Sequence, residues 1–428
     1  MNKKTTYHLS FRFFLILPAL LFFLKCSDSE SLPDFTSSNT GPYILNVEHL
    51  ELIRDNLEEP VLQQEYQILI SGADDLLQDD SFEFVTQKNE LPPSGDPHDY
   101  MSIARYSGSS DGVTNPMIYD YDRPRLARVS AAIYTLSLAY FLSGNDGNKN
   151  EYYAEKASEL VYGWFLDEST RMNPNMVYAQ VDFDTESEEG EHQRIIDAND
   201  FILVIEAVSL LYGSSHWPPN YHINLKQWFY EFSDWIIKNY NADAFCSSES
   251  WCNNISTWLD VQKAIYFLFT EQEERLNSNF HFLPISDKIK LQVQSDGRQP
   301  FEMTRSRQRH YEYFNLRAYM NLSLIRKNRS GADRDWPTPL NNSNYGGLKP
   351  ALDLVMNDIK NEGDRRQLLD DQQFDDCRYL EIFMPAAIAF ESSEYAETAE
   401  LLINNGCSHP DITLTFPPLD WLHNQPDY

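Results

Sequence analysis

The chain has 428 residues, and 42% of them are hydrophobic, so it can bury a large core. Its 65 acidic side chains outnumber 34 basic ones and give a formal net charge of −31, which argues against nucleic acid as a partner. A sugar polyanion would need a local basic pocket, because the overall field repels it.

Residues 1–25 have the pattern of an export signal. Basic residues precede the apolar run 13–24, whose twelve residues fall short of the roughly 20 that cross a bilayer as a helix. Cys26 follows at once, so we expect it to carry a lipid, although Lys25 stands where a small residue is usual. Ordinary secretion with a free thiol at Cys26 is the alternative.

These features predict an exported lipoprotein of a Gram-negative bacterium, periplasmic or anchored in the outer membrane through its N-terminal lipid. Residues 26–45 begin with a stretch rich in Ser, Asp, Pro and Gly, which predicts a flexible tether. Composition does not shift sharply within residues 46–428, so one large domain and two domains that share a core both remain open.

Helical periodicity dominates the chain beyond the tether. One apolar stripe runs from Leu126 to Tyr140 at spacings of three and four, and Gly144 marks its end. Similar stripes lie within residues 153–164, 202–211, 225–235, 258–268, 314–322 and 380–388. Alternating strand patterns are scarce, so we expect an all-α fold of helices joined by loops rich in Pro, Asn and Gly.

Four cysteines follow Cys26, and an oxidising compartment allows three ways of pairing them. The short-loop choice, Cys246 with Cys252 and Cys377 with Cys407, is favoured. Their spacing does not suggest a zinc site, and we expect neither a metal nor another cofactor.

Five polar segments follow one another between the predicted helices. They read H-D-Y-M-S, D-G-V-T-N-P, M-N-P-N-M-V-Y-A-Q, N-N and D-G-R-Q-P-F-E-M-T-R-S, at residues 98–102, 111–116, 172–180, 253–254 and 296–306. Each segment alone is ordinary turn chemistry. Taken in order, and followed by Tyr311 and the F-N-L segment at 314–316, they resemble the alginate lyase family over roughly residues 60–330.

The resemblance implies an incomplete (α/α) toroid, in which antiparallel helix pairs surround a deep cleft, and it places residues 46–428 in one domain. The sequence departs from the family at one position that matters. The family's N-N-H segment reads Asn253-Asn254-Ile255 here, so the histidine that usually assists proton abstraction is replaced by a side chain that cannot carry a proton.

The resemblance also implies the chemistry. A polyuronate lyase removes the C5 proton and breaks the bond from C4 to the glycosidic oxygen, and the neighbouring carboxylate must be neutralised first. By family position, Asn254 and Arg305 would neutralise that carboxylate, while Tyr311 would protonate the leaving oxygen. Tyr311 lies six residues after Arg305, about 9 Å along a helix, and its phenolate could also act as the base.

Other site residues follow from the same resemblance, and each has a structural alternative. Substrate-binding positions would be Asn253, Asn175, Tyr178, Gln180 and His310. Without the family context, the basic run around Arg305 reads as a solvated helix face. His310, His98 and His192 could replace the missing histidine, although each alone is more typical of a hydrogen-bonded structural histidine.

Three functions are compatible with the sequence. The first is a polysaccharide lyase acting on an acidic polysaccharide, alginate by resemblance. The second is a cell-surface glycan-binding lipoprotein that lost turnover with the histidine, and Ile255 is the feature that favours it. A glycoside hydrolase, the third, would need two carboxylates facing each other across the cleft.

Overall fold

The computed structural model describes residues 35, 41–104, 115–144, 149–183, 186–190, 192–240, 252–282, 285–328, 347–360 and 374–425. All of them belong to one compact unit that spans residues 35–428. The predicted signal, the lipid position Cys26 and the tether up to residue 40, apart from Phe35, lie outside the described residues. The α-helices of the first half of this unit are α1 (Val47–Asp55), α2 (Pro60–Leu77), α3 (Asp122–Ser143), α4 (Lys149–Val161), α5 (Asp200–Leu210) and α6 (Pro219–Asn239).

The remaining α-helices begin with α7 (Asn254–Phe269). They continue with α8 (Glu273–Phe282), α9 (Ile285–Gln292), α10 (Pro300–Met303), α11 (Gln308–Asn328), α12 (Leu348–Lys360), α14 (Leu380–Phe390), α15 (Ser393–Asn404), α16 (Pro410–Thr413) and α17 (Leu419–His423). The 3-10 helices are η1 (Val85–Gln87), η2 (Pro116–Asp120), η4 (His192–Asn199) and η6 (Asp376–Tyr379), and η3 (Tyr162–Leu166) is a π-helix. Among the described residues, strand structure is limited to β1 (Met101–Ile103) and β2 (Tyr178–Val181), which pair in parallel. The expected all-α class is confirmed.

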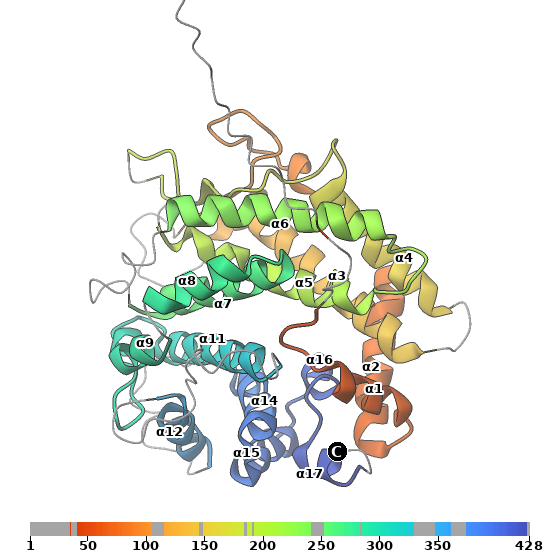
Figure 1. Cartoon of the computed structure of the whole chain (residues 1–428), viewed down its shortest axis with the longest axis vertical. Coiled ribbons are helices and arrows are strands. Elements are labelled where there is room, and N and C mark those ends of the chain that lie inside the picture. Colours follow the sequence, from red (N-terminus) through yellow and green to blue (C-terminus); the bar gives the residue numbers. More distant parts are fainter. Residues whose placement is uncertain are drawn as a thin grey trace, which may run out of the picture. The chain divides into compact units, whose positions relative to one another are not determined.

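The long helices surround a shared cavity. Contacts run from α3 to α5, from α5 to α7, from α7 to α11 and from α11 to α14, and residues of all five helices line a cavity of about 210 Å³. Partner helices pack outside them: α4 against α3, α6 against α7 and α15 against α14, as Figure 1 shows for α6 and α15. Three of the five inner helices thus have an outer partner, an arrangement compatible with the expected (α/α) toroid.

Burial explains which helices occupy the centre. Every residue of α7 is buried, because α6, α8, α11 and η4 pack around it. A helix covered on all sides can carry apolar residues all round. Helix α3 is likewise long and apolar enough to cross a membrane by length and composition, but 61% of that apolar window is buried within the domain. It is therefore a core helix, and it ends at Gly144, whose φ of +57° suits glycine.

The start of the domain is held by a buried carboxylate. The two oxygens of Glu206 on α5 accept hydrogen bonds from the backbone N–H groups of Tyr43, Ile44 and Leu45 at 2.9, 3.1 and 2.9 Å. The side-chain amide of Asn328 donates to the three carbonyls of the same residues. The predicted tether 26–45 is therefore too long at its C-terminal end, because its last residues are buried within the domain.

One predicted disulfide is confirmed. Cys377, just before α14, is bonded to Cys407, which follows α15, so the bridge closes a loop across this helix pair. Cys252 is also disulfide-bonded, but Cys246 lies outside the described residues, and their pairing stays a prediction.

The contact at Glu206 makes a testable prediction about stability. Replacing Glu206 by Ala leaves three buried N–H groups without their acceptor, and each such loss costs about 1 kcal/mol or more. We expect Glu206→Ala to lower the free energy of unfolding by about 3 kcal/mol, measured by urea denaturation. Glu159→Ala, at an exposed position on α4, serves as the control and should change it by less than about 0.5 kcal/mol. Equal stability of the two variants would contradict the structural role of Glu206.

Candidate functional site

Helix α7 begins at the N-N segment because Asn253 caps it. The Asn253 side-chain oxygen accepts the N–H of Ile255 at 3.0 Å, and its carbonyl accepts the N–H of Ser256 at 3.0 Å. Asparagine is a favoured residue at this cap position, since it satisfies an N–H that the helix leaves unpaired. The structure thus gives Asn253 a structural task, and its role in substrate binding stays a prediction.

Asn254 is held by Glu302 of α10. One carboxylate oxygen accepts the backbone N–H of Asn254 at 2.6 Å, and the other accepts its side-chain amide at 2.7 Å. Asn254 is 2% exposed and Glu302 1% exposed. Burial raises the pKa of Glu302 to about 7, against the lowering effect of the bonds from Asn254 and of the Arg305 charge.

The D-G-R-Q-P segment sets the path of the backbone that leads into α11. Gly297 has φ +86°, and a Cβ there would lie 2.2 Å from the carbonyl oxygen of Pro350, so glycine is required. The Gln299 side chain donates to the carbonyl of Glu312 at 3.3 Å and accepts the Asn315 amide at 2.7 Å. Two motif positions, Gln299 and Asn315, are therefore joined across the turn that carries Arg305.

Arg305 and Tyr311 meet at this turn. The guanidinium carbon of Arg305 lies 3.7 Å from the centre of the Tyr311 ring, within the range of a cation–π contact. The expected proximity of the two side chains is confirmed. Arg309, in the same basic run, pairs instead with Asp376, so it serves to hold η6 against α11.

His310 lies beside Tyr311 on α11. Its ring stacks on Phe314 at 5.8 Å between centroids and meets the Tyr311 ring edge-on at 5.2 Å. Arg378 of η6 approaches its Nδ1 at 3.4 Å. The structure therefore brings a second arginine next to the histidine that precedes the predicted tyrosine.

A second polar cluster surrounds Asp197 of η4. Its carboxylate accepts the Tyr100 hydroxyl at 2.9 Å, the Ser102 hydroxyl at 2.5 Å and the Gln180 amide at 2.7 Å. Arg123 of α3 approaches it at 3.7 Å and also pairs with Asp200. The H-D-Y-M-S and Y-A-Q segments thus meet at one buried carboxylate.

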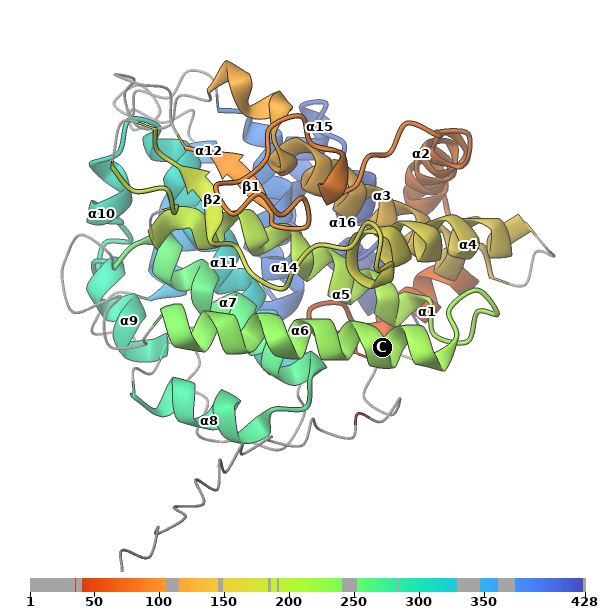
Figure 2. The ribbon, with the colours of Figure 1, turned by 90° about the horizontal axis from the view of Figure 1, so that it is seen from above.

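The backbone at Gln180 is unusual. It has φ +53°, a region that residues other than glycine seldom adopt, and its N–H donates to the Ser102 hydroxyl at 2.7 Å. Strained backbone of this kind persists where the surroundings enforce it, often at functional sites. Tyr178, at the start of the same strand, packs partly exposed against Met101, Ile103 and Tyr121. Figure 2 shows the strand pair that carries these residues.

Other predicted residues organise loops. Asn175 accepts the Val177 N–H at 3.2 Å and donates to Asp99 at 3.4 Å. His98 places Nδ1 2.6 Å from the carbonyl oxygen of Arg171. These contacts tie the H-D-Y-M-S and M-N-P-N segments together, which is a structural role for both residues. The side chain of His192 lies outside the described ones.

The two clusters adjoin the central cavity through neighbouring residues, but Asn254, Arg305, Tyr311 and Asp197 do not line it. Trp258 of α7 and Phe314 of α11, which do line it, pack at 4.9 Å between ring centroids, one helical turn beyond Asn254 and Tyr311 respectively. Arg123, which also lines it, approaches Asp197 at 3.7 Å. Ile255 is buried at 8% exposure within the hydrophobic core.

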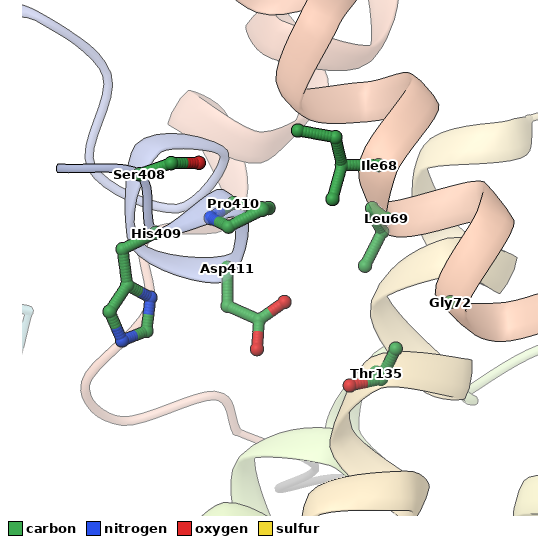
Figure 3. Close-up of a pocket in the computed structure, with 8 residues that line it drawn as sticks. All are labelled: Ile68, Leu69, Gly72, Thr135, Ser408, His409, Pro410 and Asp411. Carbon is green, nitrogen blue, oxygen red and sulfur yellow. The ribbon is translucent and has the colours of Figure 1, made fainter. Parts of the chain in front are cut away.

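A second cavity of about 360 Å³ lies between α2, α3 and α16 (Figure 3). Ile68 and Leu69 form one side, and Asp411 points into the space between them and His409. His409 lies 3.7 Å from Glu381, which pairs with Arg317 in the central cavity. The predicted site residues are not part of its lining.

The family model described as alginate lyase matches residues 84–364, more than half of the chain. The chain belongs to the alginate lyase family. A solved alginate lyase from Bacteroides ovatus is 24% identical, with a TM-score of 0.76 over 88% of this chain and 99% of that one. Alginate lyase A1-III from Sphingomonas species A1 is 16% identical, with a TM-score of 0.51 over 81% and 94% of the two chains. These likenesses show a shared fold. No curated protein is similar enough to match the chain.

Sequence reasoning missed several members of the site. Glu302 lies within the D-G-R-Q-P-F-E segment, and an acidic side chain between two arginines of the matched segment could have been noticed there. Arg378, Asp197 and Arg123 carried no local signal, because only the tertiary fold brings Arg378 to His310 and Arg123 to Asp197.

The Asp197 cluster can be tested through stability. Asp197→Ala leaves the hydroxyls of Tyr100 and Ser102 and the Gln180 amide without their shared acceptor, and it removes a partner of Arg123. Breaking a buried charged network costs about 3–5 kcal/mol. We expect a loss of that size in urea denaturation, with Glu188→Ala, an exposed acid in the same region, as an unaffected control. A loss below about 1 kcal/mol would show that the cluster does not hold the two segments together.

Proposed function

We propose that the protein is a polysaccharide lyase that cleaves a uronate-containing polymer, alginate or a related polyuronate, by β-elimination. Family membership supports the reaction class. The observation that carries the proposal is the placement of Arg305 against the Tyr311 ring, on the segment whose Glu302 holds Asn254. One amide donor, one guanidinium and one phenol are the groups that this elimination needs.

The first step lowers the charge on the substrate. The carboxylate at C5 is already negative, which disfavours removal of the neighbouring proton. Asn254 and Arg305 would bind this carboxylate, and the planar guanidinium of Arg305 can donate to both of its oxygens. The ring of His310 meets the Tyr311 ring edge-on, and the Arg378 guanidinium beside His310 adds positive charge in this neighbourhood. Such donors act most strongly on the charge that develops as the C5 proton leaves.

The second step transfers one proton between two substrate atoms. The Tyr311 phenolate takes the C5 proton, the electron pair forms the C4–C5 double bond, and the bond from C4 to the glycosidic oxygen breaks. The phenol then gives its proton to the leaving oxygen, so Tyr311 returns to its starting state. Because Ile255 cannot take part, one residue performs both transfers from one face of the sugar.

A single base and acid on one face restricts the substrate. The C5 hydrogen and the C4 oxygen must lie on the same side of the ring, which is the case in mannuronate and not in guluronate. We therefore propose that mannuronate blocks are cleaved in preference to guluronate blocks.

The glycan-binding alternative rests on Ile255, which removes a proton-carrying group from the site. Under it, the cavity would bind the polymer without forming a double bond. The Arg305–Tyr311 contact favours the lyase, because binding alone does not require a phenol under a guanidinium.

The role of Tyr311 can be tested by Tyr311→Phe. The phenylalanine keeps the ring and its contact with Arg305 but removes the proton that reaches the leaving oxygen, so the elimination rate should fall at least ~100-fold. The measurement is the ultraviolet absorbance of the unsaturated product, with polymer binding measured in parallel. His310→Ala should cost much less. Full activity of Tyr311→Phe would exclude the assigned role.

We further propose that the protein is an exported lipoprotein anchored through Cys26, on the signal-like pattern of residues 1–25. In a Gram-negative host, Cys26→Ser should move the chain from the membrane fraction to the soluble fraction, because the lipid would no longer be attached. Fractionation followed by immunoblotting measures the shift. Membrane association equal to that of the unchanged protein would speak against the lipid anchor.

A further inference from the structure

We propose that Glu302 is the positioning residue of this site: its carboxylate fixes the Asn254 amide in the orientation that presents an N–H to the substrate carboxylate. The proposal rests on the lyase function above and deepens it. Glu302 at 1% and Asn254 at 2% exposure are both buried, and Glu302 is given a role only through its contact with Asn254, so it is a positioning residue and not a catalytic one.

The geometry singles out the side chain of Asn254 as well as its backbone. Both oxygens of Glu302 are used, one for the backbone N–H at 2.6 Å and one for the side-chain nitrogen at 2.7 Å. A carboxylate that only stabilised the start of α7 would need the backbone bond alone. The second bond orients an amide whose two ends have almost the same shape, which packing by itself cannot distinguish.

The charge on Glu302 decides which end of the amide faces it. An ionised carboxylate only accepts hydrogen bonds, so it selects the NH₂ end of Asn254. The second N–H of that group then remains for the substrate. A protonated Glu302 can donate one hydrogen bond. It is therefore compatible with the opposite orientation of the Asn254 side chain, in which the amide oxygen of Asn254 faces Glu302 and the NH₂ group of Asn254 points away.

Burial makes this choice sensitive to pH. It raises the pKa of Glu302 to about 7, and the nearby charges act in both directions. Arg305, on the same segment, lowers the pKa, whereas Glu312 of α11 raises it, and the Tyr319 hydroxyl of α11 is close enough to interact with the carboxylate. Glu302 therefore ionises as the pH rises through about 7.

Activity and stability should change in opposite directions as the pH rises. The active orientation of Asn254 forms as Glu302 loses its proton, so kcat should rise with pH around 7. In the unfolded chain a glutamate has a pKa near 4.5, and the folded state holds the proton up to about 7. Between these values the folded state binds more protons, so this group's contribution to stability falls as the pH rises.

The test uses the full chain and compares Glu302→Gln with the unchanged protein. Glutamine keeps the size and one acceptor oxygen for the backbone N–H, but its NH₂ group cannot accept the Asn254 amide. We expect kcat to fall at least ~10-fold, the effect of one hydrogen bond to a charged group, with KM changed less than about twofold. The rise of kcat near pH 7 should disappear.

Two more variants separate positioning from folding. Asn254→Ala should also lose the rise near pH 7, since no amide is left to orient, and this measurement holds even where Glu302→Gln does not fold. Glu302→Asp keeps an ionisable carboxylate and should retain a pH-dependent rise. In the double variant, the losses from Glu302→Gln and Asn254→Ala should overlap rather than add.

The outcomes are distinct. A folded Glu302→Gln variant with unchanged kcat, additive losses, or a retained rise near pH 7 in Asn254→Ala would each overturn the role of Glu302 while leaving the lyase function intact. Absence of unsaturated product from the unchanged protein on every polyuronate would contradict the function and, with it, this proposal.

Discussion

The candidate site depends on the two hydrogen bonds between Glu302 and Asn254. They join the start of α7, which is buried along its whole length, to the turn that carries Arg305 toward α11. Because α7 contacts α5, α6, α8 and α11, its position is set by the packing of the entire domain. The fold therefore determines where Asn254 lies, and the Glu302 carboxylate links Asn254 to the segment that contains Arg305 and Tyr311.

The charges of the cavity are distributed unevenly, and this bears on how an acidic protein could bind an acidic polymer. Arg123 pairs with Asp200, and Arg317 pairs with Glu381, so the arginines deep in the cavity are neutralised. Arg305 lies on the tyrosine ring, and Arg378 lies near His310. Neither Arg305 nor Arg378 lines that cavity, and under the proposed function the substrate carboxylate binds Arg305, beside Tyr311.

Much of the architecture could be predicted from the sequence, because apolar periodicity reports directly on buried helix faces. The stripe from Leu126 to Tyr140 and the stop at Gly144 correspond to α3. The closeness of Arg305 and Tyr311 also followed from spacing along one segment. The pairing of Asn254 with Glu302 could not be derived, since 48 residues separate them and only tertiary packing joins them. The burial of Tyr43 to Leu45 by Glu206 escaped prediction for the same reason, and Asn253 and Asn175 show that an asparagine in a motif can be a cap or a turn residue.

The central claim is that this site performs elimination, and the most direct measurement is the product formed by the unchanged protein from a panel of polyuronates. Only elimination creates a conjugated C4–C5 double bond at the new chain end, so ultraviolet absorbance separates it from hydrolysis and from binding. The account predicts that absorbance rises as the polymer shortens, fastest on a mannuronate-rich substrate. Shortening without absorbance, or binding without shortening, would contradict it.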